Sequence, residues 1–138
     1  MSIHTYRMLI LASIAIGIGG ALIDLMIPSV LPSVLSQALD EYSETLPESE
    51  LLVIGIASII LLLVGIVSTI GLYFFRPWAP LLTVLVTVIA YPFTVLIGPT
   101  VISGWTMALM DLSTMLWGAV LALTYFSHIK NHFNYMKP

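Results

Sequence analysis

Long apolar segments with almost no charge dominate the pattern of hydrophobic and polar residues along the chain. A helix needs about 20 apolar residues to cross the ~30 Å hydrocarbon core of a bilayer. Segments of about that length lie at residues 8–27, 51–75, 78–97 and 105–126. Two helix-breaking pairs, Gly98-Pro99 and Ser103-Gly104, separate the last two segments. The pattern therefore predicts an all-α integral membrane protein, a four-transmembrane-helix bundle that forms one domain over residues 1–138.

The first segment also has features of a secretory signal peptide. Arg7 precedes it, and the small residues Gly20 and Ala21 lie near its end. Its apolar part is, however, longer than the 7–15 residues that are usual for such a signal. We therefore expect this segment to be retained as the first span.

The segment 28–50 is the one sizeable part of the chain that is expected outside the bilayer. Apolar residues recur in it at the three- and four-residue spacing of a helix, namely Val30, Leu31, Val34, Leu35, Ala38, Leu39 and Tyr42. The pattern predicts a short amphipathic surface helix between the first two spans, followed by an acidic turn. Such a helix would cap the bundle, form a docking surface for a partner, or act as a lid.

Composition indicates that lipid is the main solvent of this chain. Apolar residues make up 59% of the sequence and charged residues 8%, whereas soluble domains carry about 25% charged residues. This excludes a water-soluble globule and makes the lipid bilayer the first expected partner. A net charge of −3 with only four Lys and Arg argues against a nucleic-acid partner. The absence of cysteine excludes disulfides and thiolate metal sites.

The charged residues divide between the two sides of a four-span layout. All four basic residues fall on one side: Arg7, Arg76, Lys130 and Lys137. The segment between the first two spans carries no Lys or Arg and five acids: Asp40, Glu41, Glu44, Glu48 and Glu50. Since basic residues favour the cytoplasmic side, we expect both termini in the cytoplasm. The expected location is the cell inner membrane, as a multi-pass protein.

Two acidic residues, Asp24 and Asp111, lie inside predicted spans. A carboxyl within a span costs a few kcal/mol, so it usually faces the bundle interior or a wet cavity. Ser58, Tyr91 and Thr94 are expected at a similar depth, which predicts a protonatable or polar site within the membrane. Two interpretations remain open for Asp111. It accepts hydrogen bonds that hold helices in register, or it couples proton or cation movement to a substrate.

Small residues recur on the spans where helices would pack closely. Close backbone approach drives helix association in lipid, and glycine permits it. The candidate packing positions are Gly17, Gly20, Gly55, Gly65 and Gly118. They predict a packing seam within one bundle or a face for a homo-oligomer.

Motifs of enzymes are absent from the sequence, which holds no phosphate loop, zinc-site His-Glu pair or serine elbow. His128 and His132 have the spacing of a metal clamp, but their polar neighbours indicate a plain helix end, and we expect no metal or cofactor. The sequence favours a non-enzymatic multi-pass membrane protein that acts through helix contacts, as an accessory or assembly subunit. Its partner would be a second copy or another membrane protein. The alternative is a small oligomeric proton- or cation-coupled transporter or channel that uses Asp111.

Overall fold

The computed structural model describes residues 2–27, 34, 35, 37, 41, 47–97 and 101–134. These residues form helices and connecting turns, without a strand among them. The helices are α1 (Ile3–Met26), α3 (Glu48–Tyr73), α4 (Ala79–Ile97), α5 (Gly104–Phe126) and the short α6 (Lys130–Asn134). Residues 34, 35, 37 and 41 are also helical. The rest of the predicted surface helix lies outside the described residues.

Three of these helices, α1, α3 and α5, are long and apolar enough to cross a membrane, whereas α4 is apolar but shorter. Many of their large apolar side chains are exposed on the outside of the protein, which would be unfavourable in water. In the most apolar stretch of α3, only 6% of the residues are buried inside the protein. An exposed apolar surface of this extent fits a membrane protein. The predicted fold class is confirmed at this level, as an all-helical protein that fits a membrane bundle.

The helices α1 and α3 begin a few residues before the predicted spans, because the helix signal does not stop at the edge of the apolar segment. The α1 helix begins at Ile3, where the Ser2 side chain accepts a hydrogen bond from the Thr5 N–H at 3.2 Å and caps the helix. The α3 helix begins at Glu48, directly after Pro47. Two acids in its first turn, Glu48 and Glu50, complement the positive end of the helix dipole.

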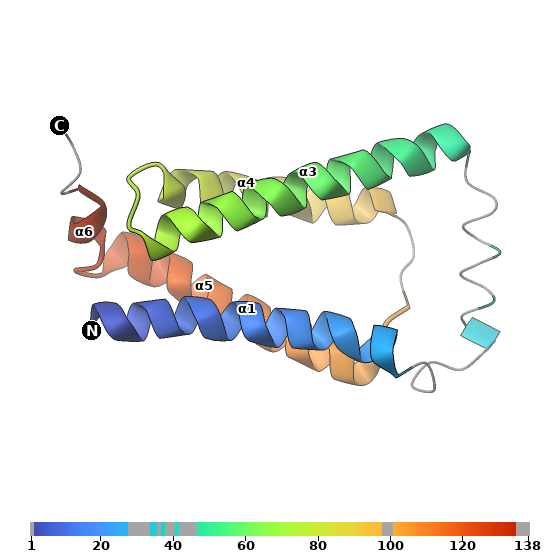
Figure 1. The fold of residues 1–138 in the computed structure, drawn as a ribbon, viewed down its shortest axis with the longest axis horizontal. Helices are drawn as coiled ribbons and strands as arrows, with labels where there is room; N and C mark the ends of the chain where they lie inside the picture. Colours follow the sequence, from blue (N-terminus) through green and yellow to red (C-terminus); the bar gives the residue numbers. More distant parts are fainter. Residues whose placement is uncertain are drawn as a thin grey trace.

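The four long helices run along one axis in alternating directions and form two antiparallel pairs (Figure 1). The α1 helix packs along α5, and α3 packs along α4, whereas contacts between the pairs are few. The pairs converge at the end that holds the start of α1 and α6, and they diverge toward the other end (Figure 1). The converging end is called the basic end below, because Arg7, Arg76 and Lys130 lie there.

The hydrophobic core lies at this basic end. It consists of Tyr6, Ile10, Leu72, Phe75, Ala79, Val120, Ile129 and Phe133. The Tyr6 ring stacks on Phe75 with centroids 5.6 Å apart, and Phe133 from α6 packs edge-on against Phe75 at 5.2 Å. Aromatic pairs in these geometries are more stabilising than their buried area alone accounts for. The core therefore joins both helix pairs and α6 at one end of the molecule.

The turn from α3 to α4 places Phe75 in this core by an unusual backbone conformation. Phe75 has a φ of 56°, in the left-handed region that favours glycine. The Arg76 N–H donates to the Gly71 carbonyl at 2.8 Å, and the Phe75 N–H donates to the Leu72 carbonyl at 3.1 Å. These two bonds form a Schellman motif. Gly71 is needed here because a Cβ at this position would lie 2.7 Å from the Cβ of Ala79.

Candidate functional site

Hydroxyl groups and glycines hold α1 against α5. The Ser113 hydroxyl donates to the Ser13 carbonyl at 2.8 Å, and the Thr106 hydroxyl donates to the Gly20 carbonyl at 3.0 Å. A Cβ at Gly17 would lie 2.9 Å from the Ser113 Oγ, and a Cβ at Gly20 would lie 3.1 Å from the Leu109 Cβ. Both glycines therefore allow the close approach that lets side-chain hydroxyls reach backbone carbonyls of the facing helix.

A further hydroxyl pair closes this contact near the basic end. The hydroxyls of Tyr6 and Thr124 lie 2.7 Å apart, and both residues are buried. Thr124 also donates to the Val120 carbonyl at 2.8 Å. Since the threonine proton is used there, the tyrosine O–H is the donor in the pair.

Asp24 connects the other end of α1 to the start of α5. Its Oδ2 accepts a hydrogen bond from the Ser103 N–H at 3.0 Å, and its Oδ1 is buried with no hydrogen-bond partner among the described residues. Ser103 is itself the N-cap of α5, because its hydroxyl accepts from the Thr106 N–H. A carboxylate at this position faces the positive end of the α5 dipole. Asp24 therefore has a clear structural partner.

Asp111 lies on a different face of α5. Its side chain is exposed on the outside of the bundle. Thr114, Gly118 and Ala122 follow it at spacings of three and four residues, and all three are exposed. These four residues are called the Asp111 stripe below. Within the described part of the chain, no atom lies within 4 Å of the place where a Gly118 Cβ would be. The stripe thus combines a carboxylate with small residues on an exposed face of α5.

Tyr91 and Thr94 line a cavity of about 440 Å³ between α4 and α5. The same cavity is lined by Thr87 from α4 and by Ser113 and Thr114 from α5. The Thr94 hydroxyl donates to the Tyr91 carbonyl at 2.6 Å. Ser58 is half-buried on α3 and does not line this cavity. The five polar residues singled out in the sequence therefore do not form one site. Tyr91 and Thr94 share this cavity, whereas Asp24 lies at the start of α5 and Asp111 on the outer face.

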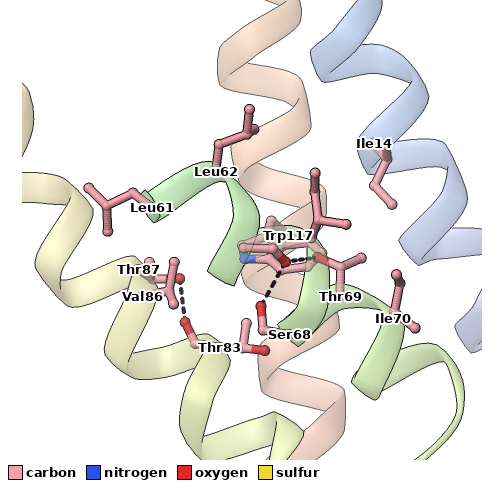
Figure 2. A pocket seen from close by; sticks show the side chains of 12 residues that line it. Ile14, Leu61, Leu62, Ser68, Thr69, Ile70, Thr83, Val86, Thr87 and Trp117 are labelled. Carbon is pink, nitrogen blue, oxygen red and sulfur yellow. Dashed lines mark hydrogen bonds between the residues drawn. The ribbon is translucent and has the colours of Figure 1, made fainter. Parts of the chain in front are cut away.

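A second, more apolar cavity of about 460 Å³, called the central cavity below, lies between the helices and is lined by side chains from all four long helices (Figure 2). Ile14 of α1, Thr83 and Thr87 of α4 and Trp117 of α5 face the α3 helix across it (Figure 2). Its few hydroxyls are bonded within their own helices, for example Thr83 to the Ala79 carbonyl at 2.8 Å. The cavity therefore presents an apolar lining to any occupant.

The candidate packing glycines of α3, Gly55 and Gly65, and the histidines His128 and His132 lie away from the contact between α1 and α5. Gly65 lines the central cavity, and no described atom lies within 4 Å of a Cβ built at Gly65 or Gly55. His132 packs against the Phe75 ring with centroids 5.6 Å apart, and His128 is exposed. The described residues bring no group of three His, Asp or Glu together that would hold a metal ion.

Sequence reasoning missed the roles of Phe75 and Trp117. An aromatic residue near a span end is typical of a membrane-interface anchor, yet Phe75 is a core residue. Trp117 lines both cavities. Trp117 lies inside a span, away from the interfaces where tryptophan is enriched, and this position could have indicated its role.

No protein family, curated protein or solved structure matches this chain.

Proposed function

We propose that this protein is a four-span membrane protein that acts through helix contacts, as an accessory or assembly subunit, and is not an enzyme. The length of α4 supports the fourth span, because 19 residues rise about 28 Å, close to a ~30 Å hydrocarbon core. The basic end would lie in the cytoplasm with both termini. A cell inner membrane is the proposed location.

The Asp111 stripe carries this proposal. Asp111 lies seven residues after the start of α5, which places it about 10 Å along the helix. A carboxylate exposed to hydrocarbon costs about 2.5–3.5 kcal/mol on insertion scales. A second helix that packs on the stripe would remove this cost by donating a hydrogen bond to Asp111. Thr114, Gly118 and Ala122 have the small-residue spacing that favours such close packing.

Site-specific photocrosslinking in native membranes tests the proposal. A benzophenone amino acid at Ala122 should crosslink to a partner helix, from a second copy or another membrane protein. The same group at Leu112, which is exposed on another face of α5, should not. Asp111→Leu should reduce the Ala122 crosslink at least tenfold, with the protein level unchanged. Equal crosslinking from both positions, or no product from Ala122, would contradict the proposal.

One observation favours the alternative, a small oligomeric proton- or cation-coupled transporter or channel. Hydroxyl side chains line the cavity between α4 and α5, and one of them, Thr114, lies about one helical turn from Asp111. On this view Asp111 binds the ion. Asp111→Asn should then abolish proton or cation flux in proteoliposomes while folding is retained. Wild-type proteoliposomes that move neither protons nor cations would exclude the alternative.

A further inference from the structure

An apolar groove runs between α1 and α3 toward the basic end. The central cavity shares Ile14, Thr69 and Ile70 with a smaller cavity of about 130 Å³ that lies between α1 and α3. Ile14, Thr69 and Ile70 are all visible along the α1 side of the central cavity in Figure 2. The two cavities thus adjoin at these three residues, and together they are called the α1–α3 groove below. Few direct contacts join α1 and α3, so protein side chains leave this space open.

The length and chemistry of the groove suit one lipid acyl chain. Its α3 wall extends from Leu61 to Phe74, which is about 20 Å along the helix axis. One leaflet of the hydrocarbon core is about 15 Å thick. The walls are largely apolar, and Leu11, Ile66 and Ile70 are about half exposed at its rim. An acyl chain can therefore enter from the side, as far as the space beside Trp117.

Arg7 lies at the basic end of this groove and is held in position by α3. Its Nε donates to the Tyr73 carbonyl at 3.3 Å, and its Cζ lies 4.8 Å from the Tyr73 ring centroid. Tyr73 itself lines the groove. Arg7, Leu11 and Ile14 follow each other on α1 at spacings of four and three residues, so the guanidinium and the groove lie on one face of the helix.

The positive charge of Arg7 determines which lipid headgroup this end of the groove favours. Among the described residues, no carboxylate contacts Arg7. The acidic residues lie at the far ends of α1 and α3, at residue 41 and in the first half of α5. Guanidinium is the group that binds phosphate oxygens with two parallel hydrogen bonds. A net negative headgroup is therefore favoured over a zwitterionic one.

We propose that the α1–α3 groove binds one acyl chain of an anionic phospholipid, with Arg7 bound to the lipid phosphate. This site goes beyond the proposed helix contacts, because it lies between α1 and α3 and not on the Asp111 stripe. The lipid would fill the space between the two helix pairs.

Native mass spectrometry of the full chain in detergent tests this site, with phosphatidylglycerol and phosphatidylcholine of identical acyl chains as probes. The wild type should bind the first phosphatidylglycerol more tightly than phosphatidylcholine. Arg7→Gln should weaken phosphatidylglycerol binding about fivefold, the factor for about 1 kcal/mol per basic residue near an anionic surface. Lys130→Gln, at the same end but outside the groove, is the matched control and should change binding less than twofold. Equal effects of the two variants would overturn the proposal in favour of diffuse attraction.

A second pair of variants tests the acyl-chain part of the site. Gly65→Leu places a side chain in the groove and should weaken the first binding event for both lipids. Gly55→Leu makes the same change on the same helix outside the groove, and no described atom restricts either position. Equal binding by these two variants would place the lipid elsewhere and overturn the proposal. If Arg7→Gln fails to fold, Arg7→Lys replaces it, because it keeps the charge and removes the planar fork. Undiminished preference in Arg7→Lys would then exclude bidentate phosphate binding.

Discussion

Phe75 adopts a backbone conformation that is unfavourable for phenylalanine, but its ring is buried in the core. A residue with a Cβ in the left-handed region costs roughly 1–2 kcal/mol relative to glycine. The ring of Phe75 contacts Tyr6, His132 and Phe133, so burial offsets this cost. Arg7 also lies above the same ring, with its Cζ 5.4 Å from the centroid. At this scale, one side chain connects α1, the α3–α4 turn and α6.

We predict that Phe75→Ala lowers the free energy of unfolding by about 3–5 kcal/mol, because it empties a ring-sized space in the core. Phe75→Gly should cost about 1 kcal/mol less than Phe75→Ala, since glycine adopts the same φ without strain. Reversible unfolding in mixed micelles measures both values. Phe74→Ala is the control, because 57% of the Phe74 surface is exposed, and its cost should be much smaller. Equal costs for Phe74→Ala and Phe75→Ala would contradict the assigned role.

The contact between α1 and α5 is the most extensive helix contact in the molecule. Hydrogen bonds cross it at three levels, from Tyr6 near the basic end through Ser113 to Thr106 near the other end. Asp24 adds a fourth at the start of α5. Polar contacts across membrane helices are each worth about 0.6 kcal/mol on average. Together with glycine-mediated close approach, they hold α1 and α5 as one unit.

A double-mutant cycle tests the Tyr6–Thr124 pair. Tyr6→Phe and Thr124→Val should show a coupling energy of about 0.5–1.7 kcal/mol in reversible unfolding, because the buried hydroxyls satisfy each other. As a control, Tyr6→Phe combined with Thr114→Val should be additive, since the exposed Thr114 hydroxyl bonds only within its own helix. A coupling energy near zero for the first pair would show that the two hydroxyls act independently.

The two ends of the molecule differ in charge and in packing. The basic residues Arg7, Arg76 and Lys130 lie at the converging end, and Glu48 and Glu50 lie at the diverging end (Figure 1). The core is at the converging end, so the helix pairs are joined there and separated at the other. We propose that the basic end faces the cytoplasm, because basic residues favour that side of a membrane.

Cysteine labelling tests that orientation and the proposed span at α4, because the chain has no cysteine of its own. In intact cells, a membrane-impermeant maleimide should label Glu48→Cys and Ile102→Cys. Pro77→Cys and Lys130→Cys should be labelled only after the membrane is permeabilised. Labelling of Pro77→Cys and Ile102→Cys from the same side would show that α4 does not cross the membrane.

The helical class, the approximate helix bounds and the separation of charge could be predicted from the sequence. Hydrophobic length and loop charge are local properties, and they do not depend on which helices become neighbours. The predicted segment 105–126 corresponds closely to α5, Gly104–Phe126. The acids Asp24 and Asp111 were both recognisable as costly within a span.

The partners of those residues were decided only by the tertiary structure. Glycines on α1 and α3 look alike in the sequence, yet Gly17 and Gly20 lie against α5 while Gly55 faces open space among the described residues. Asp24 lies at the start of α5, and Asp111 on the same helix faces outward. The physical reason is that the rotation of a membrane helix about its axis is set by packing against its neighbours. An apolar segment specifies that a helix forms, and packing between helices specifies which side chains meet.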